Sequence, residues 1–301
     1  MARDGTLDRR GRLVVLAGPG VIDDDRVEDL RAFAAAGDLG VANTWGAKGV
    51  FAWDSPHHLG TCGLQAHDFE LLGFGAADAI VVVGADPDES PPARLALAPR
   101  VDLEPAELGV AAGRIVNTGP PLPNELYRRL AAVAQPGYGD DKVPLHPARA
   151  VADVAAAVPA GGLVTAEPGL AGLWVARTFA TPALTPGAKR RVVVPARRDP
   201  GVAVRLAAAE AAAGRPAVAV VSEPLDEATA EAIERALDQP APLVIEVWSE
   251  QASLARADAH AAQLAGALDA GSPEMLAVPV CVDDTAQLLE AAGPVVAWGG
   301  L

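Results

Sequence analysis

A glycine turn near the start of the sequence is the first place where the residues offer chemistry. Gly18 and Gly20 follow an apolar run from Leu13 to Ala17, and carboxylates begin at Asp23. Glycines between a strand and a helix N-terminus let backbone N–H groups approach a phosphate closely. A tight turn without a ligand needs the same residues. The pattern therefore marks a candidate anion site and leaves the purely structural interpretation open.

Side chains that can bind a metal are concentrated in one short stretch. They are His57, His58, Cys62, His67 and Asp68. Their spacing matches none of the paired spacings usual for zinc ligands, so we predict no metal site. The sequence also has no Gly-x-Ser-x-Gly elbow, Walker motif or zinc-protease histidine pair, so we predict no catalytic residue.

Charge limits the classes of partner. The net charge is −15, and an acidic protein on average repels nucleic-acid phosphates and anionic membranes, so neither is an expected partner. The exception is one basic cluster, which consists of Lys189, Arg190, Arg191, Arg197 and Arg198. It is either a solvated loop or a site for phosphate or an acidic partner.

Cysteine use and the terminal segment predict a cytoplasmic protein. Cys62 and Cys281 form no disulfide framework, which is typical of a reducing compartment. The stretch from Met1 to Arg12 is charged and lacks the apolar core of a signal peptide, and no apolar run approaches the roughly 20 residues that span a bilayer.

The pattern of elements predicts an α/β fold. The 301 residues are long for one core, so we expect two domains. Apolar runs alternate with helical patterns along the whole chain, which is typical of parallel sheets. A Pro- and Gly-rich linker from Gln135 to Pro147 divides the chain into domains 1–135 and 136–301. We therefore predict two doubly wound, Rossmann-like domains with mostly parallel sheets.

The residue ranges of the predicted elements follow from periodicity and turn residues. In the first domain we expect strands at 13–17, 79–83 and 101–103 and helices at 23–36 and 66–72. In the second we expect strands at 163–166, 192–194, 217–221, 243–247, 277–282 and 295–298.

The first domain resembles the central domain of the acetolactate synthase group of thiamine-diphosphate enzymes. The resemblance covers roughly the first 120 residues and is carried by VVLAGPGV at 14–21, VANTWGAKGVF at 41–51, HHLGTCGLQAHDFELLGFGAAD at 57–78, IVVVGADPDE at 80–89 and VDLEPAELG at 101–109. Some members of that group hold FAD or an ADP moiety in this domain, and others leave the crevice empty. The resemblance implies a nucleotide crevice that is formed by Gly18, Gly20, Thr44, Gly60, Gly63, Gly84 and Asp86.

The second domain resembles the diphosphate-binding domain of the same superfamily, but its functional positions differ. Glu167 and Gly169 stand where relatives carry Asp-x-Gly, and Ser222-Glu223-Pro224 replaces Gly-Asp-Gly. The asparagine expected after the next strand is absent, and Trp248 and Ser249 lie there. Relatives use the motif's Asp and Asn to bind magnesium, which demands close octahedral oxygen geometry. We therefore expect neither thiamine diphosphate nor magnesium to bind to the isolated chain at this degenerate site.

Three functions remain open. The chain is a degenerate relative that is catalytically silent alone and acts through a nucleotide-like ligand or a partner chain. Alternatively, it is one subunit of a split thiamine-diphosphate-dependent lyase or transferase for 2-oxo acids, whose pyrimidine-binding domain is a separate chain. The third alternative is a structural or regulatory subunit. In each case the resemblance implies an oligomer, and we expect a homodimer.

Overall fold

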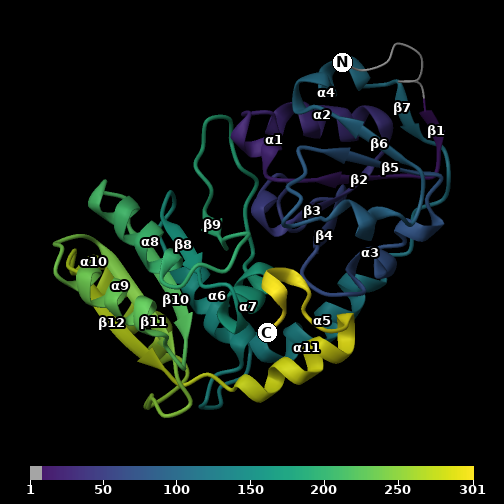
Figure 1. Cartoon of the computed structure of the whole chain (residues 1–301). Coiled ribbons are helices and arrows are strands. Elements are labelled where there is room, and N and C mark those ends of the chain that lie inside the picture. Colours follow the sequence, from purple (N-terminus) through teal and green to yellow (C-terminus); the bar gives the residue numbers. More distant parts are fainter. Residues whose placement is uncertain (1–8) are drawn as a thin grey trace. The chain divides into compact units, whose positions relative to one another are not determined.

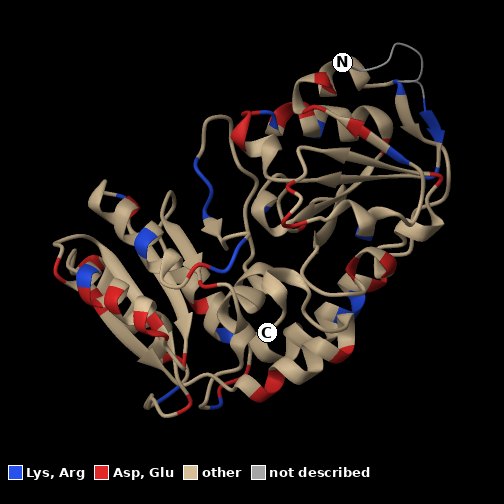
Figure 2. Ribbon diagram, in the orientation of Figure 1, with Lys and Arg blue, Asp and Glu red and all other residues tan. Residues whose placement is uncertain are grey.

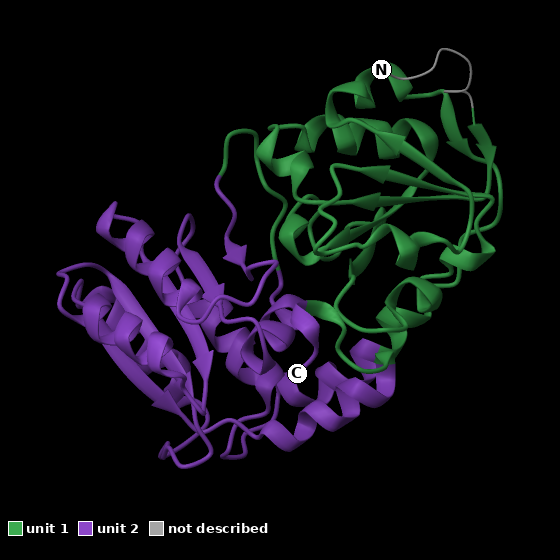
Figure 3. Ribbon diagram, viewed as in Figure 1, with its two compact units in different colours: residues 1–129, 181–188, 292–297 green, residues 130–180, 189–291, 298–301 purple. Residues whose placement is uncertain are grey.

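The computed structural model describes residues 9–301, and the expectations for residues 1–8 lie outside the described part. The chain divides into two compact units (Figure 3). Unit 1 contains Met1–Arg129, Thr181–Ala188 and Ala292–Ala297, and unit 2 contains Leu130–Ala180, Lys189–Ala291 and Trp298–Leu301. Each unit is built around its own parallel sheet.

Unit 1 has a five-stranded sheet in the order β4-β3-β2-β5-β6 (Figure 1). Its strands are β2 (Leu13–Ala17), β3 (Gly40–Thr44), β4 (His58–Cys62), β5 (Ala79–Val83) and β6 (Arg100–Leu103). The central strands β2 and β5 are apolar and buried along their whole length, as expected for strands that are covered on both faces. A separate two-stranded parallel sheet is formed by β1 (Arg9–Gly11) and β7 (Ile115–Asn117).

Short helices connect the strands of unit 1. They are α1 (Gly20–Asp23), α2 (Val27–Gly37), α3 (Asp68–Leu71), α4 (Leu108–Ala111) and the start of α5 (Glu125–Tyr138). The single helix expected at 23–36 is divided at Asp25, whose φ of 54° is left-handed and incompatible with a continuous helix. The main core joins α2 and α4 to one face of the sheet, through side chains such as Phe33 and Leu108.

Unit 2 has a second five-stranded parallel sheet, in the order β12-β11-β10-β8-β9. The strands are β8 (Leu163–Ala166), β9 (Val192–Val193), β10 (Ala217–Ser222), β11 (Leu243–Trp248) and β12 (Glu274–Val278). The helices are α6 (Pro147–Ala157), α7 (Leu170–Thr178), α8 (Val202–Ala212), α9 (Glu227–Leu237), α10 (Ala259–Asp269) and α11 (Thr285–Ala292).

Helices cover both faces of this sheet. Ile245 and Val247 of β11 belong to a core with α8 and α9. Glu246 points to the opposite face, where it contacts His260 of α10. The predicted α/β class with two doubly wound, parallel, Rossmann-like sheets is confirmed.

Three sequence expectations differ from the structure. The strand expected at 277–282 lies at β12 and ends at Val278, because Pro279 has no N–H to continue a ladder. The strand expected at 295–298 is absent from the described residues: Val295 forms an isolated bridge, and Trp298 adopts a positive φ of 58°. The linker expected from Gln135 begins inside α5, which continues through Pro136 to Tyr138.

The basic cluster flanks β9, and most of its positions are visible as blue segments in Figure 2. Lys189 forms an ion pair with Glu210 at 3.0 Å, and Arg191 donates to the carbonyl of Val158. These contacts hold part of the cluster within unit 2. Among residues 9–301, no helix is both long and apolar enough to cross a bilayer.

Candidate functional site

The glycine turn of unit 1 lies at the switch point of its sheet, between β2 and β5. Doubly wound folds bind ligands beyond the carboxyl ends of their strands at such points. Here the two loops pack directly together: Gly18 donates its N–H to the Val83 carbonyl at 2.9 Å, and Gly20 donates to Gly84 at 2.9 Å. These two N–H groups, which the sequence predicts to face a phosphate, are therefore used within the protein.

Steric contact explains why these positions are glycine. A Cβ at Gly18 would lie 2.4 Å from the Gly84 oxygen and 2.5 Å from the Cα of Ala85. Gly84 has a positive φ of 58°, and a Cβ there would lie 2.7 Å from the nitrogen of Val21. The structure thus brings together three of the predicted crevice residues, but as a backbone-to-backbone contact.

The remaining predicted crevice residues lie on neighbouring segments. Thr44, at the end of β3, is fully buried, and its hydroxyl has no hydrogen-bond partner within the described part of the chain. A Cβ at Gly63 would lie 2.6 Å from the carbonyl oxygen of Glu89, whereas one at Gly60 would meet nothing within 4 Å. Asp86 accepts from the backbone of Asp88 and so shapes its own turn. A nucleotide in unit 1 stays a prediction.

The metal-capable stretch is engaged in local contacts. His57 contacts the Leu39 carbonyl at 3.0 Å, and His58 Nε2 lies 2.8 Å from the side-chain oxygen of Asn43. Burial lowers the pKa of His58 to about 4, so its imidazole is neutral at pH 7. The described residues contain no group of three or more His, Cys, Asp or Glu side chains arranged for a metal ion.

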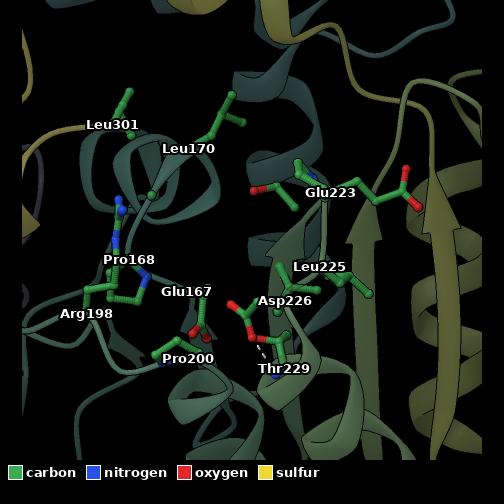
Figure 4. Close-up of a pocket in the computed structure, with 14 residues that line it drawn as sticks. Glu167, Pro168, Leu170, Arg198, Pro200, Glu223, Leu225, Asp226, Thr229 and Leu301 are labelled. Carbon is green, nitrogen blue, oxygen red and sulfur yellow. Dashed lines mark hydrogen bonds between the residues drawn. The ribbon is translucent and has the colours of Figure 1, made fainter.

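The switch point of unit 2 lies between β8 and β10, and it opens into a cavity of about 510 Å³ (Figure 4). The loop after β8 supplies one wall with Glu167 and Gly169. The end of β10 supplies the other wall with Ser222 and Glu223. All four residues that the sequence predicts for a degenerate diphosphate site therefore line one cavity.

Glu167 connects this cavity to the start of α8. Its carboxylate accepts from the backbone N–H of Gly201 at 2.8 Å and of Ala203 at 3.1 Å. Burial raises the pKa of Glu167; its two backbone donors lower it, and the nearby Asp226 carboxylate raises it further. A helix N-terminus attracts anions, and here the anion is part of the chain.

Glu223 is held in a similar way on the other wall. It accepts from the hydroxyl of Ser249 at 2.5 Å, where relatives are expected to carry a magnesium-binding asparagine. The next residue, Pro224, has no N–H to offer a phosphate. A second cavity of about 570 Å³ shares Glu223, Pro224 and Leu225 and extends to Trp248 and Gln251.

These residues do not fit a magnesium-bound diphosphate. Three carboxylates line the cavity of about 510 Å³, from Glu167, Glu223 and Asp226, against one guanidinium, from Arg198. The diphosphate would meet like charges. Magnesium needs close octahedral coordination by several oxygens, and the described residues contain no group of three or more His, Cys, Asp or Glu side chains arranged for a metal ion.

Three polar residues of the cavity were not predicted as site residues. Asp226 is the N-cap of α9, a position that its sequence pattern indicates. Arg198 belongs to the basic cluster, but only the structure shows that it lines the cavity. Thr229 lies inside a helical pattern, and nothing in the sequence distinguishes it from an ordinary helix residue.

Two doubly wound parallel units, one with an open cavity at its switch point, define a Rossmann-like α/β protein with a ligand-sized site. Residues 6–115 match the family model for the central domain of thiamine pyrophosphate enzymes. This match covers about a third of the chain and coincides with the segments that carry the resemblance in the first domain. No curated protein sequence matches this chain.

The fold is also similar to that of a solved protein. An X-ray structure of a candidate thiamin diphosphate-dependent enzyme from Mycobacterium smegmatis superposes with a TM-score of 0.64 at 18% sequence identity. The match covers 91% of this chain and 62% of that one, so this chain spans less than two thirds of its structural neighbour. At this identity the likeness shows the shared fold.

Proposed function

We propose that this chain does not use thiamine diphosphate by itself and acts by binding a small ligand or a partner chain. The observation that carries the proposal is the position of Glu167, whose carboxylate accepts both Gly201 and Ala203 N–H groups at the start of α8. A cofactor diphosphate at this helix would have to displace that carboxylate and leave it buried without its donors. Such a loss costs roughly 1–3 kcal/mol or more for a charged group.

Calorimetry with thiamine diphosphate and magnesium tests the proposal directly. We expect no saturable heat with the full chain up to millimolar cofactor, and a micromolar dissociation constant would overturn the proposal. A variant with Ser222→Gly, Glu223→Asp, Pro224→Gly and Ser249→Asn restores the family motif. Adding Glu167→Ala to that variant frees the start of α8. If the variant with five substitutions binds the cofactor and the variant with four does not, Glu167 is the decisive obstacle.

The second candidate is a subunit of a thiamine-diphosphate-dependent 2-oxo acid lyase or transferase with its pyrimidine-binding domain on a separate chain. The family match over residues 6–115 supports it, while the self-occupied helix start counts against it. Mixing the chain with such a partner, cofactor and pyruvate should restore turnover under this candidate. The absence of turnover favours the ligand-binding or regulatory role.

The other expectations from sequence are retained here as proposals. Two free cysteines support a cytoplasmic location. Apolar side chains exposed on unit 2 support a homodimer; one of them is Met275 on the edge strand β12, which is 49% exposed. Light scattering measures the oligomeric state, and a monomer at high concentration contradicts the dimer. A thermal shift with FAD or ADP tests a nucleotide in unit 1.

A further inference from the structure

Two carboxylates from different loops face the cavity of unit 2. Glu167 and Asp226 both line it, and Figure 4 shows them on opposing sides of the space. Their charges interact, because Asp226 contributes to the raised pKa of Glu167. Two carboxylates that face one cavity repel each other, and this repulsion destabilises their charged forms unless a positive group lies between them.

A buried hydroxyl lies beside this pair of carboxylates. Thr229 lines the same cavity and is 2% exposed, and its Oγ1 has no hydrogen-bond partner within the described part of the chain. Its backbone N–H donates to Asp226 at 2.8 Å, which fixes the residue next to the carboxylate. A buried hydroxyl that lacks a hydrogen-bond partner lowers the stability of the folded state. A ligand that donates a hydrogen bond to it would recover that stability.

We propose that this cavity binds a small molecule through a primary ammonium group, held by Glu167, Asp226 and Thr229. An ammonium carries one positive charge and three N–H donors, which match two carboxylates and one hydroxyl. The cavity volume of about 510 Å³ is in the range usual for small-molecule sites. The proposal rests on the proposed function, since a cofactor diphosphate would occupy the same space.

Other occupants of the cavity are less well matched. A divalent metal needs several protein oxygens in one shell, and residues 9–301 contain no group of three or more candidate ligands. A quaternary ammonium lacks N–H groups and would leave the Thr229 hydroxyl unpartnered. An anion would meet three carboxylates and a single guanidinium, that of Arg198, which already donates to the Gly300 carbonyl at 2.9 Å.

Ligand-observed NMR and calorimetry with the full chain test the proposal. The probes are ethanolamine, 1,4-diaminobutane and γ-aminobutyrate, with 1-butanol and tetramethylammonium as matched controls without an ammonium N–H. We expect at least one primary amine to saturate the protein below millimolar concentration, and neither control to bind. Failure of all three amines at 10 mM overturns the ammonium site, whereas only thiamine-diphosphate binding overturns the proposed function.

Two variants separate recognition from folding. Thr229→Val removes the unpartnered hydroxyl at nearly constant shape, so it should leave the unfolding midpoint unchanged or raise it while weakening the amine about tenfold. Asp226→Asn keeps an N-capping side chain for α9 and should also weaken the amine at least tenfold. Unchanged amine affinity in both folded variants would place the amine elsewhere and overturn the assignment.

Discussion

The two switch points of this protein show how the same topological position can be closed in one unit and open in the other. In unit 1, Gly18 and Gly84 allow two loops to meet backbone to backbone, and N–H groups of the first loop donate to carbonyl groups at the start of the second. In unit 2, the equivalent loops carry Glu167 and Asp226, and a cavity of about 510 Å³ remains between them. A parallel sheet therefore offers a place for a ligand, but the residues after its strands decide whether the place is free.

Adding one methyl group to each switch point gives the largest expected contrast. Gly18→Ala places a Cβ 2.4 Å from a backbone oxygen and should destabilise the protein by about 3 kcal/mol, the upper part of the usual range for overpacking. Gly169→Ala meets nothing within 4 Å, but its φ of +146° is unfavourable for alanine, so we expect about 1 kcal/mol. Urea unfolding measures both.

Gly109→Ala is the control for this pair, because it lies in α4 with no neighbouring atom within 4 Å of the new Cβ. It should be neutral or stabilise by roughly 0.5 kcal/mol, since alanine favours helix. A Gly18→Ala protein as stable as this control would mean that the two loops separate easily. The closed state of the unit 1 switch point would then have to be abandoned.

The strands that form these switch points were predictable from sequence, and their loops were not. The runs at 13–17 and 79–83 are apolar throughout, which identified β2 and β5 with the observed bounds. The glycines after them were ambiguous, because close approach to a phosphate and close approach to another loop require the same residue. Only the register of β2 beside β5 brings Gly18 to Gly84.

The second contrast concerns the polar groups inside the two sheets. The strands β2 and β5 carry only apolar residues, whereas β11 carries Glu246, fully buried between Trp248 and His260. His260 lies 3.2 Å from Glu246 and 3.1 Å from Asp153 of α6. Burial opposes the charged imidazole, but the two carboxylates outweigh it and raise the pKa of His260 to about 9.

This raised pKa predicts that unit 2 loses stability in alkali. The unfolded histidine has a pKa near 6.5, so the contribution is fully present below pH 6.5 and is lost as pH rises through 9. A shift of this size corresponds to about 3 kcal/mol at most, with about 2 kcal/mol expected after relaxation of the buried network. Urea unfolding at pH 6 and pH 10, followed by tryptophan fluorescence, measures the loss.

An NMR titration of the His260 imidazole provides the control, because it reports the group directly in the folded protein. A midpoint near 9 supports the buried ion network. A midpoint below 6.5 would show that desolvation exceeds the effect of the carboxylates, and the stability would then rise with pH instead of falling. His58 serves as the opposite case, since burial lowers its pKa to about 4 in unit 1.

Part of the candidate site was also predictable, and the reason lies in the chain's order of elements. Glu167 and Glu223 follow two predicted strands, and strand ends of one parallel sheet lie at the same edge. Their hydrogen bonds to Gly201 and Ser249 were not predictable, because the partners come from loops whose paths depend on tertiary packing. Thr229 was missed because its unpartnered hydroxyl is a property of its surroundings.

The smallest expected effect distinguishes the structural role of the cavity's acids from their role toward a ligand. Asp226 accepts from the Thr229 N–H as the N-cap of α9, and Asp226→Ala removes that bond along with the charge. We expect a loss of about 1 kcal/mol in unfolding free energy, typical for an N-cap, with Asp226→Ser retaining most of the stability as the matched control. Removing the charge also takes away one of the influences that raise the pKa of Glu167, so a carbon-detected titration should show a lower midpoint in both variants. If the midpoint of Glu167 stays unchanged, the two carboxylates do not interact across the cavity, and its opposing acidic walls cannot be what separates this switch point from the closed one in unit 1.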